Sequence, residues 1–383
     1  MVKRIAISLT AICLVTVALS ACQDMAIQYY NMGIDAIEEG DTASAVEYFE
    51  KSLGIRENDP DAHMNLGVAL YGIGDYDRAL RELRIAAEDY PSDPVLHYNI
   101  AEVYAALGQF QAATTEYEYA LRLNPDFVEA HSALGKLLMD GGHYAAAESH
   151  FYDALALVPS HSDTQLRMGW LYIYIGKYNE ATHYFYRGLQ KQPRSAYGRL
   201  GLAMSQVKRG DYEEALNEYK KVSSWDRRDP DALLGIGVCQ LNLGRLSQAQ
   251  KAIENSIEVK ADNPEAYKVL GDLYIAQDQY AEAIASYRMA VVQQEDFADA
   301  HLGLGRALET VGHLTEAEEA LQKALYHDPD SPQVLYRLGQ LYLLKDDRGL
   351  AQSYLEMAMD KVAGDVELEN TIRNALKSLS ERE

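Results

Sequence analysis

The 383-residue sequence contains only three cysteines, which limits the chemistry that thiols can perform in it. No CxxC motif occurs and no two cysteines have metal-ligand spacing, so a thiolate metal site is not expected. Cys13 lies in an apolar N-terminal run, and Cys239 lies inside a predicted helix, where we expect a small buried thiol. Cys22 is the one cysteine whose position suggests chemistry.

Proline and basic residues are also scarce. There are 10 prolines, while hydrophobic residues make up 48% of the chain, a composition that favours ordered helical structure over disorder. Lysine and arginine number 35 against 58 acidic residues, which gives a net charge of −23. Non-specific nucleic-acid binding needs a basic surface, so no nucleic-acid partner is expected. The charge favours partners that are basic or whose charges are locally matched.

Catalytic motifs are absent as well. The sequence has no HExxH, GxSxG or P-loop motif. Gly235-x-Gly237 and Gly303-x-Gly305 lack the third glycine of a dinucleotide fingerprint and lie in predicted helices. We therefore expect no enzymatic activity, no cofactor, no metal and no small-molecule substrate.

The N-terminus carries a predicted targeting segment. Lys3 and Arg4 precede an uncharged apolar run from Ile5 to Leu19. This pattern predicts a secretory signal peptide over residues 1–21. A membrane anchor is the alternative, but a spanning helix needs about 20 apolar residues and this run is shorter.

The end of the apolar run resembles the lipobox of bacterial lipoproteins. The residues are Leu19-Ser20-Ala21-Cys22, with small side chains before the thiol. The resemblance implies cleavage before Cys22, attachment of diacylglycerol and palmitate there, and a lipidated N-terminus and linker over residues 22–25. Two or more acyl chains would anchor the protein stably. Gln23 stands where an inner-membrane lipoprotein of this type has Asp, which implies the outer membrane, facing the periplasm.

The remainder of the chain repeats one 34-residue pattern ten times. The clearest copy spans residues 128–161, and the frames begin at residues 26, 60, 94, 128, 162, 196, 230, 264, 298 and 332. Each frame has Leu-Gly or a similar pair, then an alanine, an aromatic or aliphatic residue and often a late proline. This pattern resembles the tetratricopeptide repeat (TPR). The resemblance implies an all-α fold: a right-handed superhelix, or α-solenoid, of ten helix-turn-helix repeats over residues 26–363, with a capping helix and tail over 364–383.

We call one position of the repeat, taken across the ten aligned frames, a column. Three columns have residue types that helix packing explains. Position 8 is glycine or alanine, which lets the second helix approach the first. Position 20 is alanine in all ten frames, where a larger residue would overpack at a typical cost of about 1–3 kcal/mol. Position 24 is aromatic or aliphatic and fills the interior. Gly-Asp pairs such as Gly74-Asp75 and Gly210-Asp211 predict the turn within a repeat, and pairs such as Asp59-Pro60 and Ser331-Pro332 predict helix starts.

Candidate binding residues lie in the other columns of the first helix, at positions 2, 5, 6, 9, 12 and 13, which line the concave surface in this family. Position 6 is asparagine in the first three repeats: Asn31, Asn65 and Asn99. Amide groups donate and accept hydrogen bonds, so this ladder predicts contact with an extended peptide backbone. The alternative is that asparagine is simply common at this position in the family.

An apolar groove is predicted farther along the chain. Repeats 5–7 place Leu166, Trp170, Tyr174, Leu200, Met204, Leu234 and Val238 in groove columns. Exposed apolar patches of this kind mark partner sites, and Trp and Tyr are frequent anchors. The alternative is a misassignment of column exposure by one position. His63, His97 and His131 share position 4, but adjacent repeats are too far apart to bind one ion, so we expect partly buried packing histidines.

These observations predict a lipid-anchored periplasmic TPR scaffold that mediates protein–protein interactions in envelope machinery, of the pilus, secretin, secretion or envelope-hydrolase adaptor type. Its partners would be proteins or peptides in the concave groove, with the membrane contacted through the N-terminal lipid. The alternative function is a polysaccharide-export factor that binds glycan in the groove. The 28 tyrosines favour that alternative, and the apolar surroundings of the predicted site argue against it.

Overall fold

A computed structural model describes residues 23–362 and 364–380, and these residues form helices and turns without a strand. The predicted signal peptide and Cys22 lie outside the described residues. Residues 23–25, which we expected to belong to a linker, are helical. Within the described ranges, no helix combines the length and the apolar character that crossing a bilayer requires.

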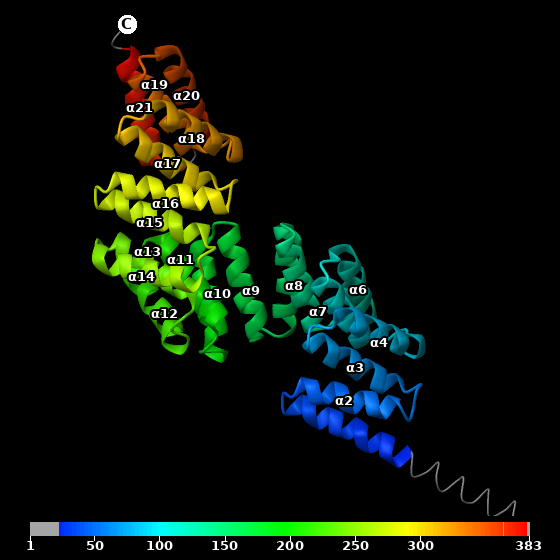
Figure 1. The fold of residues 1–383 in the computed structure, drawn as a ribbon. Helices are drawn as coiled ribbons and strands as arrows, with labels where there is room; N and C mark the ends of the chain where they lie inside the picture. The colour runs from blue at the N-terminus through cyan, green and yellow to red at the C-terminus, as the bar shows by residue number, and fades with distance from the viewer. Residues whose placement is uncertain (1–22, 363, 381–383) are drawn as a thin grey trace, which may run out of the picture. The chain divides into compact units, whose positions relative to one another are not determined.

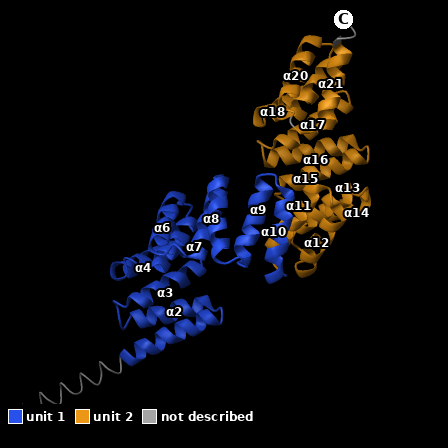
Figure 2. Ribbon diagram, turned by 180° about the vertical axis from the view of Figure 1, so that it is seen from behind, with its two compact units in different colours: residues 1–193 blue, residues 194–383 orange. Residues whose placement is uncertain are grey.

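The chain divides into two compact units, residues 1–193 and 194–383 (Figures 1 and 2). Each is a stack of helical hairpins, the all-α solenoid that the repeats predict. Unit 1 contains helical residues 23–38 followed by α2 (Thr42–Leu53), α3 (Pro60–Gly72), α4 (Tyr76–Asp89), α5 (Pro94–Ala106), α6 (Phe110–Leu123), α7 (Val128–Asp140), α8 (Tyr144–Leu157), α9 (Ser162–Tyr174) and α10 (Tyr178–Lys191).

Unit 2 continues the same alternation and ends in one additional helix. Its helices are α11 (Ala196–Arg209), α12 (Tyr212–Trp225), α13 (Pro230–Asn242), α14 (Leu246–Val259), α15 (Pro264–Ala276), α16 (Tyr280–Gln293), α17 (Ala298–Thr310), α18 (Leu314–His327), α19 (Pro332–Leu344), α20 (Arg348–Lys361) and α21 (Val366–Ser380).

The predicted packing columns meet inside each hairpin. A Cβ atom added to Gly135 would lie 2.6 Å from Cε1 of Phe151, so position 8 must be small where position 24 is aromatic. Ala147, at position 20, is fully buried beside them. Cys239 is also fully buried, as expected, and burial raises the pKa of its thiol to about 12. The repeat columns that recur are therefore the ones that hold the two helices together.

The turns within the hairpins depend on backbone with positive φ. Eight of the ten turn residues are glycines such as Gly74, with φ of 83°, and the other two are Asp278 and Asp346, with φ of 60° and 61°. The missing glycine of repeat 10 therefore does not change the turn, because aspartate tolerates this conformation better than most residues.

Most predicted helix caps form, and two do not. The side chain of Asp59 accepts a hydrogen bond from the backbone N–H of Ala62, as expected for a helix start. Asp211 makes no such bond and instead forms an ion pair with Arg209 at 3.1 Å. Ser331 also makes no cap bond. The predicted caps at these two residues are therefore wrong, although both helices start at the predicted positions.

Helix α21 covers the end of repeat 10. Ile372 is fully buried against Leu335 and Leu355, and Leu368 and Leu376 pack around it. The apolar pattern of residues 366–380 predicts Val366 on the same face as these residues, but Val366 is 67% exposed and takes no part in this packing.

Candidate functional site

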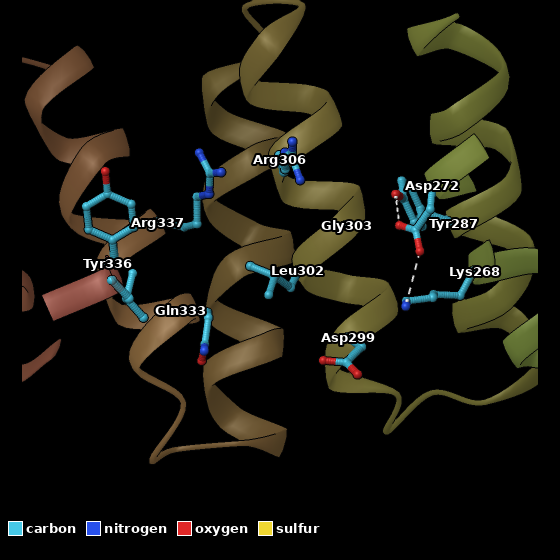
Figure 3. Close-up of a pocket in the computed structure, with 11 residues that line it drawn as sticks. Lys268, Asp272, Tyr287, Asp299, Leu302, Gly303, Arg306, Gln333, Tyr336 and Arg337 are labelled. Atoms are coloured by element: carbon cyan, nitrogen blue, oxygen red, sulfur yellow. Dashed lines mark hydrogen bonds and ion pairs between the residues drawn. The ribbon is translucent and has the colours of Figure 1, made fainter. Parts of the chain in front are cut away.

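A pocket of about 360 Å³ lies in unit 2, on the side of the hairpins formed by their first helices (Figure 3). We call it the unit-2 groove. Most of its lining comes from positions 2, 5, 6 and 9 of α15, α17 and α19: Lys268, Asp272, Asp299, Leu302, Gly303, Arg306, Gln333, Tyr336 and Arg337. Tyr287 of α16 and Leu368 of α21 complete it. In repeats 8–10, these columns, which were predicted to line the concave surface, line a pocket.

A tyrosine and an acid form the floor of the unit-2 groove. The Tyr287 hydroxyl donates a hydrogen bond of 2.7 Å to Asp272, and the Lys268 ammonium lies 3.1 Å from the same carboxylate. Burial and the Asp272 carboxylate raise the pKa of Tyr287, so the hydroxyl stays protonated as a donor. Burial alone would lower the pKa of Lys268, but Asp272 and Glu265 raise it overall, so the lysine stays charged. Both donors therefore hold the acid in place.

The opposite side of the unit-2 groove carries two guanidinium groups, Arg306 on α17 and Arg337 on α19 (Figure 3). Arg306 is exposed, and Arg337 donates a hydrogen bond of 2.9 Å to the uncharged amide of Gln340 and lies 6.0 Å from the centre of the Tyr336 ring. Glu309 is near both arginines, but burial raises the pKa of its carboxyl more than they lower it. This wall can bind a carboxylate, because a guanidinium group can form two parallel, bidentate hydrogen bonds with a carboxylate.

Unit 1 has a groove of the same construction. A pocket of about 280 Å³, which we call the unit-1 groove, is lined by Tyr71, Glu102, Ala105, Ala106, Phe110, Tyr117, Ala133, Lys136, Leu137, Asp140 and Arg167. Glu102 occupies position 9 and Tyr117 position 24 of one repeat, the positions that Asp272 and Tyr287 occupy in another. The hydroxyl groups of Tyr117 and Tyr71 both donate to the Glu102 carboxylate. Burial, then Glu102, raises the pKa of Tyr71 to about 12.

The cations of the unit-1 groove have partners within it. Lys136 lies 2.6 Å from the carboxylate of Asp140, and Arg167 donates a hydrogen bond of 3.1 Å to the backbone carbonyl of Ser132. Sequence reasoning missed both grooves as binding sites. The available signal was a tyrosine at position 24 in a repeat whose position 9 is acidic, which occurs in repeats 3 and 8.

The predicted asparagine ladder lies in unit 1, but its members have different surroundings. Asn31 is exposed and Asn99 is half-buried. Asn65 donates hydrogen bonds of 2.9 Å to the Tyr30 hydroxyl and to the backbone carbonyl of Asp61. Its amide donor is therefore used within the protein, while peptide binding by the three residues stays a prediction.

Two of the residues predicted to line an apolar groove are core residues. Leu166 is 2% exposed, and its Cδ2 atom would lie 2.5 Å from a Cβ added to Gly188, so it packs inside its own hairpin. Leu234 is buried with Ala249 and Ile253. The predicted exposure of these two residues is wrong, because both pack against the second helix of their own hairpin.

The other apolar candidates are partly or fully accessible within their units. In unit 1, Tyr174 is 56% exposed and stacks on Tyr144 at a ring distance of 6.1 Å, and Trp170 meets Phe185 edge-on at 5.8 Å. In unit 2, Met204 is exposed, while Leu200 and Val238 are half-buried against core clusters. Partner binding by these residues stays a prediction.

The histidines at position 4 are held by hydrogen bonds, as expected of packing residues. Nδ1 of His63 lies 2.6 Å from Glu82, and Nδ1 of His97 lies 2.7 Å from Glu116. Nε2 of each contacts a backbone carbonyl of the preceding loop. His131 keeps the carbonyl contact but faces a different partner, His150.

Models of the tetratricopeptide repeat match residues 36–103, 166–232, 206–273, 269–332 and 302–361, and a TPR repeat model matches residues 102–142. No match was found among curated protein sequences. Yeast Tom70 has a similar structure, at 14% identity with a TM-score of 0.53, covering 94% of this chain and 96% of that one. The APC/C hetero-tetramer Cut9–Hcn1 gives 17% identity, a TM-score of 0.51 and coverage of 90% and 95%. At these identities the two structures support the fold alone. The matched ranges, the hairpins and the recurring packing columns together show that this chain belongs to the tetratricopeptide repeat family, whose members serve as protein-interaction scaffolds.

Proposed function

We propose that this protein is a lipid-anchored scaffold that faces the periplasm, and that its unit-2 groove binds a carboxylate-bearing segment of a protein partner. The observation that carries the proposal is the pair Arg306 and Arg337 on one wall of a groove built from the columns that this family uses for binding. Lys268, Arg306 and Arg337 outnumber the two lining carboxylates, Asp272 and Asp299, so the groove as a whole favours an acidic segment.

The anchor is proposed from the sequence. The small residues before Cys22 and the apolar run from Ile5 to Leu19 match the requirements of lipoprotein processing. Gln23 after the cysteine supports the outer membrane as the destination. A scaffold tethered there would bring partners together in envelope machinery, for which pilus, secretin or secretion assembly and adaptor work for envelope hydrolases are the candidate settings.

Fractionation of cells tests the anchor. Cys22→Ala should release the protein from the membrane fraction, because Cys22 supplies the thiol to which the lipid would be attached. A matched Cys239→Ala variant, which changes a buried thiol, should stay with the membrane. Membrane association that survives Cys22→Ala would contradict the anchor.

Capture of partners from the same envelope tests the groove. Arg306→Ala combined with Arg337→Ala should weaken recovery of the partner about tenfold or more, since charge-assisted hydrogen bonds contribute about 1.5–3 kcal/mol each. Arg373→Ala is the matched control: this exposed arginine of α21 forms an ion pair with Glu369 and does not line the groove. Recovery that falls equally in the control would point to general charge and not to the groove.

Glycan binding is the second candidate, because the Tyr336 ring lies among Gln333 and Arg337, the mixture of aromatic and polar groups that a sugar would need. Calorimetric titration of the protein with acidic peptides and with neutral oligosaccharides separates the two. Binding of the peptides that is lost in the double arginine variant supports the scaffold. Binding of the oligosaccharides that is lost in Tyr336→Ala supports glycan recognition.

A further inference from the structure

One side-chain cluster of unit 1 lies outside both grooves and brings together three metal-binding atoms. His131 on α7, and His150 and Asp153 on α8, each place one nitrogen or oxygen within 4.8 Å of the others. The Nδ1 atoms of the two histidines are 3.1 Å apart, and Oδ2 of Asp153 lies 3.9 Å from Nδ1 of His131. The cluster is formed by one hairpin, so its geometry is fixed by the packing of a single repeat.

We propose that Nδ1 of His131, Nδ1 of His150 and the carboxylate of Asp153 bind one Zn²⁺ ion. A tetrahedral zinc ion with bonds of about 2.0–2.1 Å holds its ligand atoms roughly 3.3 Å apart. The two nitrogens, 3.1 Å apart, are close to this separation, and the Asp153 carboxylate, now 3.9 Å from Nδ1 of His131, would have to move closer. Its side chain is 55% exposed and free to do so. This site goes beyond the scaffold function and does not depend on it.

The tautomer of His131 suits this role. Its Nε2 atom lies 3.0 Å from the backbone carbonyl of Pro125, which can only accept a hydrogen bond, so Nε2 carries the proton. Nδ1 then presents a lone pair toward His150. Metal-binding histidines commonly donate their other N–H to a carbonyl or carboxylate in this way. The side chain of His131 is 12% exposed, so the ring is held in position by its surroundings.

The neighbouring repeats show what is special about this one. In repeats 2 and 3 the equivalent histidines face Glu82 and Glu116, so each ring lies between two acceptors and is held by ordinary hydrogen bonds. In repeat 4 the same position is His150, so two imidazole nitrogens face each other where the other repeats place a carboxylate opposite the ring. A neutral imidazole is the form of histidine that binds a metal.

Two imidazoles and one carboxylate suit a divalent transition metal ion better than Ca²⁺ or Mg²⁺, which prefer oxygen ligands. Three protein ligands leave the fourth position of zinc open to water or to a group from a partner. A metal ion here would bridge α7 and α8 and would stabilise the hairpin of repeat 4 in proportion to its binding.

The chain offers a variant that removes the site with little risk to folding. Repeat 5 has Gln165 at the position of His131, and its amide donates to the carbonyl of Pro159 as Nε2 of His131 does to Pro125. His131→Gln therefore preserves the hydrogen bond and deletes the ligand. Asp153→Asn removes the carboxylate charge with nearly the same shape. His97→Gln makes the matched change in repeat 3, where no site is proposed.

The test is calorimetric titration of the untagged full chain with ZnCl₂ after treatment with a chelator, together with the absorption spectrum after titration with Co²⁺. We expect one Zn²⁺ per chain and a tetrahedral Co²⁺ spectrum. Both His131→Gln and Asp153→Asn should weaken zinc binding about tenfold or more, because even partners outside the ligand set commonly contribute 10–100-fold. His97→Gln should bind like the unaltered protein. Failure of the unaltered chain to bind zinc, or equal affinity in the two ligand variants with their helicity intact, would overturn the proposal.

Discussion

In the unit-1 groove Glu102 accepts hydrogen bonds from two tyrosines, whereas in the unit-2 groove Asp272 is shared between one tyrosine and Lys268. Hydroxyl groups hold an acid without offsetting its charge, while an ammonium offsets it. The acid of the first groove is therefore held by neutral donors, while the acid of the second is held in part by a cation. One repeat framework thus builds two grooves with different arrangements of charge.

The largest expected effect on stability concerns the packing around Tyr287, the tyrosine on the floor of the unit-2 groove. A Cβ atom at Gly271 would lie 2.6 Å from Cε1 of Tyr287, and the ring is buried. Gly271→Val should lower the free energy of unfolding by about 3 kcal/mol, as overpacking does. Urea unfolding followed by circular dichroism measures it. Gly349→Ala is the control: its Cβ would meet only Asp347, at 3.8 Å, so that variant should be as stable as the original or more stable.

The next largest effect compares how strongly Glu102 and Asp272 depend on their tyrosine donors. Tyr117→Phe and Tyr287→Phe each delete a hydrogen bond to a carboxylate, at a cost of about 1.5–3 kcal/mol for a charged acceptor. We expect Tyr117→Phe to cost more, because Glu102 then keeps only the neutral hydroxyl of Tyr71, whereas the charged Lys268 still holds Asp272 after Tyr287 is changed. Unfolding of the two variants under identical conditions measures the difference. A larger loss for Tyr287→Phe would show that the lysine does not support the floor of the unit-2 groove.

A smaller effect, of the opposite sign, concerns the turns. All the turns of unit 1 use glycine at positive φ, whereas Asp346 of unit 2 takes a φ of 61°. Asp346→Gly should raise the free energy of unfolding by about 1 kcal/mol, since a Cβ is unfavourable in this region. Asp278→Gly should gain less, because the Asp278 carboxylate accepts a hydrogen bond of 3.0 Å from Tyr280 that the variant loses. Equal gains would mean that this bond adds nothing.

The smallest effect depends on pH. His301 of repeat 9 is 3% exposed, and burial, followed by Lys323 and His327, lowers its pKa, although a hydrogen bond to the Glu295 carbonyl acts in the other direction. The unfolded chain then takes up the proton more readily, so the stability that His301 contributes is complete above about pH 6.5 and is lost as the pH falls.

His301→Gln should therefore reduce the loss of stability between about pH 7.5 and pH 5.5, by less than about 1 kcal/mol. The measurement is the urea midpoint at each pH. His97→Gln in unit 1 serves as the control, because its ring lies beside the Glu116 carboxylate. An unchanged pH dependence of stability in His301→Gln would contradict the proposed lowering of the His301 pKa in the folded protein.

The fold was predictable from the sequence because its determinants recur. Gly135 and Phe151 illustrate this, since their contact is required in every hairpin and appears in the sequence as two columns. The exceptions are local. Asp211 was expected to cap a helix, but Arg209 lies close enough to pair with it, and a pattern of residue types does not contain that distance.

The candidate sites were less predictable, because they depend on which columns face each other across a hairpin. Leu166 and Trp170 look alike as apolar residues in groove columns, yet Leu166 is almost fully buried beside Gly188, whereas Trp170 is half-buried. Tyr117 and Glu102 are fifteen residues apart, and only the hairpin brings them together. The same holds for His131 and His150, nineteen residues apart, which only the packing of α7 against α8 brings together.

The central claim, that the unit-2 groove binds an acidic segment of a protein partner, is tested most directly by a photo-crosslinking residue placed at Tyr336 in the full chain in its native envelope. We predict crosslinking to a protein segment rich in Asp or Glu, identified by mass spectrometry, and loss of that product when Arg306→Ala and Arg337→Ala are added. Absence of a product, or a product that persists without the two arginines, would contradict the claim.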